Sequence, residues 1–268
     1  MQSYIHFIGT GCGRPLSTRK LPSYLIRLPN GKLVLLEAGA TLNSDIHGQY
    51  PYINITQITD IIISAMNIEL FSGLPSLLHS MRLLNRTLPL SIIAPQSLNF
   101  LIADLLKKDK VKISFDIRYY DIENEPSFDF GGKFQLTIRE SPFKIGSYQV
   151  YLSFLSKEKE ILIYYTGKSR GYIDSELLSN FDGYKFVIHD CTYSYDDAYL
   201  SKKTGLSSYR DVIDFREKID AIAVFLVHYS SRYHVPEKDI AKNRIKFDNI
   251  IFTHDNYHYD LNYVLSLI

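Results

Sequence analysis

The sequence has few cysteines, no long apolar run and almost no net charge, and each absence excludes a class of protein. Its two cysteines, Cys12 and Cys191, do not form a Cys-x-x-Cys metal motif and give little reason to infer a disulfide framework. No run of about 18 apolar residues could cross a bilayer, and the first residues match neither a signal peptide nor a transit peptide. We therefore expect a cytoplasmic protein whose cysteines are small buried thiols.

The charges nearly balance, because 30 basic residues face 29 acidic ones and the formal net charge is +1. Such a chain lacks the broad positive field of proteins that hold nucleic acid mainly by counterion release. A local patch is still available, since Arg14, Arg19 and Lys20 cluster near the N-terminus and are candidate binding residues. The alternative is that these three side chains are ordinary solvated surface.

The 268 residues, 46% of them hydrophobic, are enough for a full apolar core. The length allows one large domain or two small ones. No linker, low-complexity tract or repeat interrupts the chain, so we expect one domain over residues 1–268.

The first half reads as strands followed by two amphipathic helices. Strands are predicted at 4–8, 24–28, 33–36 and 61–63, and helices at 71–84 and 97–108. Pro29-Asn30-Gly31-Lys32 joins the second and third strands, and Asn-Gly in such a place is a strong hairpin signal because both residues tolerate positive φ.

The second half continues with strands and then alternates strands with helices. Strands are predicted at 113–119, 134–138, 149–154, 161–165, 186–189, 221–227 and 250–253. Helices are predicted at 195–203, 209–218, 236–243 and from 259 to the end. This list favours an α/β (α+β) fold in which two sheets are covered by helices.

Six blocks along the chain form one pattern, and they lie at 7–15, 21–39, 73–95, 188–193, 202–212 and 227–233. Three of them look like a His-Glu-Ala-Thr motif (IHDCTY), a Gly-His-Ser-Thr motif (KKTGLSSYRDV) and a His-Phe-Ser-Ser-Arg-Tyr motif (VHYSSRY). Together the six blocks resemble tRNase Z, the endonuclease that trims the 3′ ends of precursor tRNAs, a member of the metallo-β-lactamase superfamily. The resemblance implies a four-layer αβ/βα sandwich with its site on the open edge between the sheets, where the family binds two zinc ions for phosphodiester hydrolysis.

The chain departs from the family at most of the zinc-binding positions. The Thr-His-x-His-x-Asp-His loop corresponds to residues 64–70, which carry Ala65, Asn67, Glu69 and Leu70 at the ligand positions. Ala65 and Leu70 offer no donor atom, Asn67 offers only a weak neutral oxygen, and Glu69 keeps a carboxylate.

The other positions that the resemblance marks have changed as well. Pro142 takes the place of a histidine ligand, Lys168 that of the aspartate that bridges the two ions, and Leu206 that of a histidine near the leaving group. A cation at the bridging position opposes metal binding. His228 alone is kept, so we expect neither a zinc site nor any other cofactor.

The segment 143–161 is short, whereas many relatives insert there a long arm that grips tRNA. We therefore expect no exosite arm. For Lys168 we predict an ion pair with Glu69, and with Glu37 as a further partner, in the space of the missing metals. An exposed lysine is the equally weighted alternative.

Several retained residues have both a functional and a structural interpretation. His228, with Ser230, Ser231 and Arg232, could bind phosphate or RNA, although we favour loop shaping by hydrogen bonds for this segment. His189 and Asp190 could be a remnant of a proton-transfer pair or a satisfied buried pair.

Two further patterns receive low weight as sites. His254, Asp255, His258 and Asp260 would form a metal site only if the segment is helical, and the family resemblance gives Asp255 a structural role. Gly9, Gly11 and Gly13 lack a following Lys-Ser/Thr pair and are interpreted as turn glycines.

The function that follows is that of a catalytically inactive tRNase Z homologue that acts by binding, as a homodimer or with an active related subunit, in RNA processing or an RNA–protein assembly. The first alternative is an active endoribonuclease or other phosphodiesterase that uses a rearranged, metal-poor site of Asn67, Glu69, His189 and His228. The second is a structural scaffold whose cleft is filled by Met66, Leu70 and Lys168.

Overall fold

The chain folds into two compact units, each built around one large sheet. The computed structural model describes residues 3–49, 53–108, 110, 112–129, 134–156, 158–179, 181–233, 236–241, 249–261 and 263. Unit 1 comprises Met1–Thr10, Lys20–Glu125 and His254–Ile268, and unit 2 comprises Gly11–Arg19 and Pro126–Thr253.

The sheet of unit 1 has the strand order β16-β1-β3-β4-β5-β6-β7. Its strands are β1 (Tyr4–Gly9), β3 (Ser23–Arg27), β4 (Leu33–Leu36), β5 (Asp60–Ile62), β6 (Leu90–Ala94), β7 (Ile117–Asp121) and β16 (Tyr257–Asp260). Pairing is antiparallel from β16 to β4 and parallel from β4 to β7. The helices are α1 (Leu42–Gln49), α2 (Ile68–Phe71), α3 (Leu74–Leu83), α4 (Gln96–Lys108) and the 3-10 turn η1 (Ile55–Gln57).

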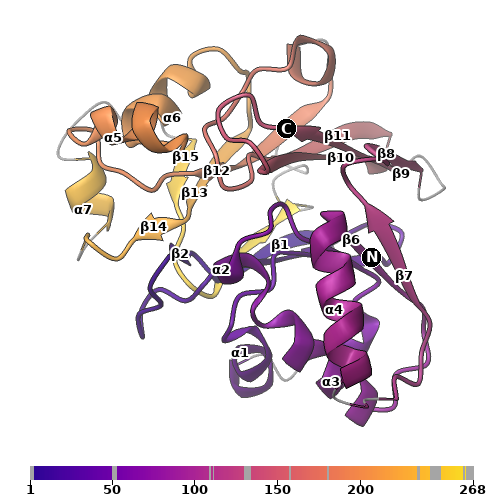
Figure 1. The fold of residues 1–268 in the computed structure, drawn as a ribbon. Helices are drawn as coiled ribbons and strands as arrows, with labels where there is room; N and C mark the ends of the chain where they lie inside the picture. The colour runs from indigo at the N-terminus through magenta and orange to yellow at the C-terminus, as the bar shows by residue number, and fades with distance from the viewer. Residues whose placement is uncertain are drawn as a thin grey trace. The chain divides into compact units, whose positions relative to one another are not determined.

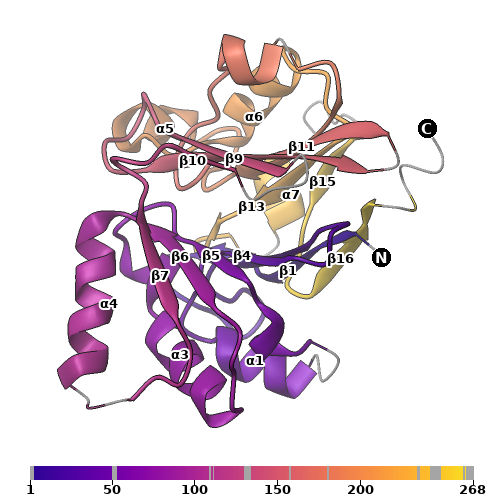
Figure 2. The same cartoon turned by 90° about the vertical axis from the view of Figure 1, so that its right-hand side faces the viewer.

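Helices α1, α3 and α4 lie on one face of this sheet (Figure 2). In α3 the buried positions Leu74, Leu77, Leu78 and Met81 follow the i, i+3, i+4, i+7 spacing of one helical face. They pack in one core with buried strand residues, among them Leu25, Leu35, Ile61 and Ile92.

The sheet of unit 2 has the order β15-β13-β12-β11-β10-β9-β8. Its strands are β8 (Ser127–Asp129), β9 (Phe134–Glu140), β10 (Tyr148–Ser156), β11 (Lys159–Tyr165), β12 (Tyr184–Asp190), β13 (Ala223–Val227) and β15 (Ile250–Phe252). The short strands β2 (Gly11–Cys12) and β14 (Tyr229–Ser230) pair with each other. The helices are α5 (Ala198–Thr204), α6 (Tyr209–Arg216), α7 (Pro236–Ala241) and the π-helical turn η2 (Ser175–Ser179), and Figure 1 shows α5 and α6 near each other in this unit.

Strands β11, β12, β13 and β15 of unit 2 run parallel, so their carboxyl ends share one edge. Helix α6 begins at Ser208, which forms a reciprocal capping box with Asp211. Its buried residues Val212 and Ile213 pack in the same core as Val187 and Leu226 of the sheet. The cap and the apolar stripe fix the position of α6 beside this edge.

The mixed α/β class expected from the sequence is confirmed, and most predicted elements lie where they were expected. The hairpin between β3 and β4 forms, although only Gly31 of its central residues has positive φ (87°). Strand β6 and helix α1 were not predicted. Among the described residues, no helix is both long and apolar enough to cross a bilayer.

Three predicted elements were wrong in part. The helix expected over 71–84 is divided between α2 and α3, because the N–H of Gly73 donates to the main-chain oxygen of Ala38 instead of continuing the helical ladder. The strand expected at 113–119 is β7, displaced to Ile117–Asp121. The segment from 259 onward begins as the end of β16 rather than as a helix, and most of its remainder lies outside the described residues.

A buried histidine on one strand of unit 1 contacts an exposed histidine on the neighbouring strand. The Nδ1 atoms of His6 on β1 and His258 on β16 lie 3.3 Å apart. Burial, together with His258, lowers the pKa of His6 from 6.5 to about 4. The folded state therefore binds a proton at His6 less readily than the unfolded chain does.

We expect stability to fall in acid because of His6. Its contribution is fully present above a pH of 6.5 and is lost as the pH falls to about 4. A shift of this size corresponds to about 3 kcal/mol. Urea unfolding at several pH values should therefore show a smaller loss in His6→Phe than in the unaltered chain or in the control His254→Phe. An equal acid loss in all three proteins would contradict this role.

Candidate functional site

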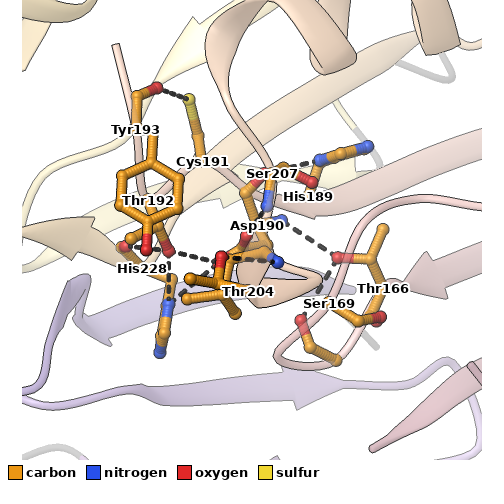
Figure 3. Close-up of polar contacts among 12 residues, drawn as sticks. Thr166, Ser169, His189, Asp190, Cys191, Thr192, Tyr193, Thr204, Ser207 and His228 are labelled. Atoms are coloured by element: carbon orange, nitrogen blue, oxygen red, sulfur yellow. Dashed lines mark hydrogen bonds and ion pairs between the residues drawn. The ribbon is translucent and has the colours of Figure 1, made fainter. Parts of the chain in front are cut away.

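Polar side chains gather where the parallel strands of unit 2 end (Figure 3). Thr166 follows β11, Asp190 ends β12 and is followed by Thr192, and His228 follows β13. The carboxyl ends of parallel strands are the usual place for sites in α/β folds. The sequence order thus brings residues from three separate segments to one edge.

Asp190 is the centre of this cluster and is fully buried. Its Oδ1 lies 2.8 Å from His228 Nδ1 and accepts a hydrogen bond from the Thr192 hydroxyl at 2.9 Å. Its Oδ2 accepts the main-chain N–H of Ser207 at 2.5 Å, and its own N–H donates to the Thr166 hydroxyl at 2.9 Å. The carboxylate is therefore held from several segments at once.

The contact with Asp190 also sets the state of the His228 ring. A carboxylate next to Nδ1 favours the proton on that nitrogen, so Nε2 is the acceptor nitrogen of the neutral ring. The His228 backbone has a φ of 66°, a left-handed conformation that is costly for a residue with a Cβ. Such strain persists where the surroundings hold it, and it is frequent at functional sites.

The sequence led us to expect that the His189 ring pairs with the Asp190 carboxylate. That expectation was wrong, because the ring contacts the main chain of Asp190 instead. Its Nδ1 donates to the main-chain oxygen of Asp190 at 2.7 Å, and its ring packs edge-on to Phe215 with the centroids 4.9 Å apart. Burial lowers the pKa of His189, so the ring is neutral near pH 7. The Asp190 carboxylate instead pairs with the ring of His228, at 2.8 Å.

In unit 1, the loop that carries the changed zinc-binding positions has a structural role. Ala65 and Leu70 belong to the apolar core. Asn67 caps α2, because its side-chain oxygen accepts the main-chain N–H of Glu69 at 3.3 Å. Glu69 is buried, and the buried Glu37 accepts the N–H of Ser64 at 3.3 Å.

The remaining changed positions lie in unit 2. Pro142 is exposed in a turn that starts at Ser141, and Lys168 follows Gly167, which has a φ of 65°. Leu206 is half-buried and directly precedes Ser207. Lys168 belongs to unit 2 and the carboxylates of Glu37 and Glu69 to unit 1, so the ion pair predicted between them stays a prediction.

These residues do not fit the two zinc ions that the fold's hydrolytic relatives would require. A zinc site needs about four nitrogen, sulfur or oxygen ligands, and Ala65, Leu70 and Pro142 supply none. The amide oxygen of Asn67 is engaged in its helix cap, and Lys168 is a cation. Within the described ranges, no three His, Cys, Asp or Glu side chains lie together as a metal site would need.

The basic residues near the N-terminus do not form one free patch. Arg14 is exposed. The guanidinium of Arg19 lies 4.6 Å from the centroid of the Tyr229 ring and donates to the Thr253 oxygen at 2.6 Å. In unit 1, Lys20 pairs with Asp45 at 2.7 Å. Two of the three cations are thus engaged within the fold.

The segment after His228 has the loop-shaping contacts that we favoured. The hydroxyl of Ser230 accepts the N–H of Arg232 at 3.4 Å. Tyr233 donates to the Asp197 carboxylate at 2.6 Å and accepts the N–H of Ser194 at 2.8 Å. Burial and the Asp197 carboxylate raise the pKa of Tyr233 to about 12, although the Ser194 contact opposes the shift. Ser231 is half-buried, and Arg232 is exposed, with its guanidinium 5.3 Å from the centroid of the Tyr193 ring.

The two patterns that carried low weight as sites, the histidines and aspartates of 254–260 and the glycines of 9–13, have structural roles. The segment 254–260 forms a turn and the strand β16, so the helical spacing required for a metal site there does not occur. Asp255 instead accepts hydrogen bonds from Thr10 N–H, the Thr10 hydroxyl and Lys20 N–H at 2.7–2.8 Å. Gly9 and Gly11 lie in strands, and of the three glycines only Gly13 has a left-handed φ.

One observation argues against the alternative of a structural scaffold whose cleft is filled by side chains. Leu70 is buried, but Met66 is 46% exposed, so it is poorly placed as filling for a cleft. The sequence interpretation missed the contributions of Thr166, Thr192 and Ser207 to the Asp190 network. Thr166 and Thr192 could have been found as hydroxyl residues beside the strand ends, whereas Ser207 contributes its main-chain N–H, which no side-chain pattern indicates.

Comparison with known proteins relates the chain to one group. It is 28% identical to ribonuclease Z of Pyrococcus abyssi over 176 residues, which are 65% of this chain and 52% of that protein. It is 34% identical to ribonuclease Z of Saccharolobus solfataricus over 125 residues, 45% of this chain and 40% of the relative. The matches thus span about two fifths to half of the curated relatives. No protein-family model matches the chain.

Solved structures extend the likeness over nearly the whole chain. Human tRNase Z, short form, has a TM-score of 0.78 at 20% identity and covers 96% of this chain and 99% of its own. The metallo-β-lactamase fold protein YhfI from Bacillus subtilis has a TM-score of 0.71 at 15% identity, with 97% and 100% covered. The metallo-β-lactamase fold expected from the sequence is confirmed.

Proposed function

We propose, from the premise that this chain is a tRNase Z-like protein of the metallo-β-lactamase fold, that it is a catalytically inactive homologue that acts by binding in RNA processing. The observation that carries the proposal is the use of the former ligand loop in the fold. Ala65 and Leu70 pack in the core and Asn67 caps α2, so these positions serve stability where a hydrolase would bind metal.

Electrostatics supports the same proposal. Two zinc ions carry four positive charges, which the carboxylate ligands of a hydrolase offset in part while neutral imidazoles complete the coordination. Lys168 adds a further positive charge at the position that resembles the bridging aspartate. His228 remains, but a single imidazole does not hold zinc.

A second candidate, a phosphodiesterase with a rearranged site, is favoured by one observation. The Asp190–His228 pair, at 2.8 Å, resembles the carboxylate–imidazole pairs in which histidine acts as a general base. The strained φ of His228 is compatible with such a role. We rank this candidate second because the former ligand loop serves the fold and a single imidazole does not hold a metal ion.

Cleavage of a precursor tRNA with a 3′ trailer separates the two candidates. We expect the protein to produce no cleavage with added zinc or manganese, and to bind the same RNA in a gel-shift assay. The matched control is His228→Ala. Cleavage that this variant abolishes would establish the rearranged site and contradict the proposal, whereas cleavage that survives it would point to a contaminating nuclease.

The proposal includes a homodimer, or a dimer with a related active subunit, in the cytoplasm. Exposed leucines at the end of α3 and in the loop that follows it support the dimer, since Leu83, Leu84 and Leu88 are 59%, 49% and 52% exposed. They belong to the 73–95 block, which lies near the subunit contact in the family that the sequence resembles. Light scattering of the purified chain tests the homodimer, and a mass of about 31 kDa would exclude it.

A further inference from the structure

A cavity of about 300 Å³ lies within unit 2, beside α6 and apart from the Asp190 carboxylate. Its wall comes from the turn after β9, the segment after β11, and α6 with the residues that follow it. Its aromatic and charged lining residues are Phe143, Arg170, Tyr172, Asp211, Asp214 and Lys218. The volume is at the lower end of the range for small-molecule sites, about 300–1,000 Å³.

Arg170 in this wall has an unmet hydrogen-bond donor. Its Nη2 pairs with Asp211 at 2.8 Å, and its guanidinium lies 4.6 Å from the centroid of the Phe143 ring. Its Nε is buried and has no hydrogen-bond partner among the described residues. A buried donor without an acceptor is costly, so a ligand atom that accepts this N–H would be favoured.

An acceptor without a donor lies directly behind the same wall. The Nδ1 of His189 donates to the Asp190 oxygen, so the Nε2 of this neutral ring is an acceptor, and no described residue donates to it. Gly171 lines the cavity, and a Cβ on it would collide with this Nε2. Only glycine therefore fits between the cavity and the imidazole.

The exposed part of the cavity is aromatic and carries charges of both signs. Phe143 and Tyr172 are 39% and 43% exposed, with their rings 6.3 Å apart and edge-on. The lining has two basic residues, Arg170 and Lys218, and two acidic ones, Asp211 and Asp214, so their formal charges cancel. Such a lining suits a planar, largely neutral ligand that has donors and acceptors along one edge.

We propose that this cavity binds a single nucleobase, stacked on Tyr172 and hydrogen-bonded to Arg170 Nε and the Asp214 carboxylate. Every base has a π-face for stacking, and guanine also presents acceptors together with neighbouring N–H donors. The base belongs either to a free nucleotide or to an unpaired residue of an RNA strand. In the second case the inference rests on the RNA-binding part of the proposed function, and it extends that part by assigning a base-binding cavity.

Calorimetric titration of the full chain with guanosine 5′-monophosphate tests the proposal, with guanosine and ribose 5-phosphate as companion probes. The nucleotide and the nucleoside should bind, and the sugar phosphate should not. Tyr172→Ala should weaken binding about tenfold or more, since a stacked base contributes on the order of a factor of 5 to 100. Tyr172→Phe should retain binding.

The matched control is Tyr199→Ala on α5, because Tyr199 is 70% exposed and belongs to the same unit. Comparable binding of ribose 5-phosphate would overturn the base assignment. No binding at millimolar nucleotide, or equal losses in Tyr172→Ala and Tyr199→Ala, would overturn the site. Tyr172→Phe keeps the test valid if the alanine variant folds poorly.

Competition with a single-stranded pentanucleotide that carries one central guanine distinguishes the two sources of the base. Displacement of the nucleotide that is lost in Tyr172→Ala assigns the cavity to RNA, and absence of displacement assigns it to free nucleotides. The cleavage assay tests the proposed function separately. If the cavity binds no base, the proposal of catalytic inactivity still stands. If the protein cleaves RNA, the assignment of a base to the cavity still stands.

Discussion

Replacement of Asp190 by alanine is expected to lower the free energy of unfolding by about 3 to 5 kcal/mol, because it leaves several buried donors without an acceptor and each such group costs about 1 to 3 kcal/mol. The Asp190 carboxylate accepts hydrogen bonds from Thr192, Ser207 and His228, and all of these groups are buried. Without the carboxylate, the Ser207 N–H and the His228 Nδ1–H lose their acceptor in a place that water does not reach.

Urea unfolding measures this effect, and Asp182→Ala is its matched control because Asp182 is an exposed carboxylate of the same unit. We expect the control to change stability by less than about 0.5 kcal/mol. Asp190→Asn should fall between the two, since the amide keeps one acceptor oxygen but turns an N–H₂ group towards another donor. A loss at Asp190 no larger than that of the control would refute the structural importance of the network.

Replacement of Arg86 by alanine is expected to cost about 3 kcal/mol or more, because it removes three hydrogen bonds made by a charged and buried side chain. Arg86 is 2% exposed and donates to the oxygens of Leu88, Thr56 and Pro89 at 2.8, 2.5 and 2.7 Å. It thereby ties the loop between α3 and β6 to η1. Burial lowers the pKa of Arg86 to about 10, and nearby Asp60 opposes this shift, so the guanidinium stays charged at neutral pH.

The geometry of the side chain makes Arg86→Lys an informative second variant. A lysine ammonium keeps the charge but cannot present the planar fork that reaches separate carbonyls, so we expect it to recover only part of the loss. Arg118→Ala is the control, because its ion pair with Asp116 is 59–60% exposed and such pairs contribute little. Full recovery with lysine would show that charge, rather than the fork, is what stabilises this loop.

Much of the fold could be predicted from local patterns, and the failures have physical causes. Strands such as β4 are short apolar runs bounded by turns, and α4 has a clear apolar stripe and a lysine-rich end. Helix α1 (LNSDIHGQ) has little amphipathic pattern, so its place depends on packing against α3. The aromatic alternation of Tyr257 and Tyr259 favours a strand, and β16 forms there because β1 offers it an edge.

The candidate site, too, could be predicted from the sequence only in part. Sequence resemblance indicated which positions had lost metal donors, because the side chain at a position decides whether it can coordinate. It could not indicate what replaced the donors, since the cap made by Asn67 and the choice of His228 rather than His189 as the partner of Asp190 depend on backbone direction. The His189 ring, on the residue next to Asp190, faces Phe215 instead.

The measurement that tests the account most directly is the metal content of the purified chain after incubation with zinc and removal of the excess, determined by mass spectrometry. The account predicts well below one zinc ion per chain, because Ala65, Leu70, Pro142 and Lys168 supply no ligand and Asn67 is engaged in its cap. Two tightly bound zinc ions per chain would contradict it and would show that the chain builds a metal centre from other residues.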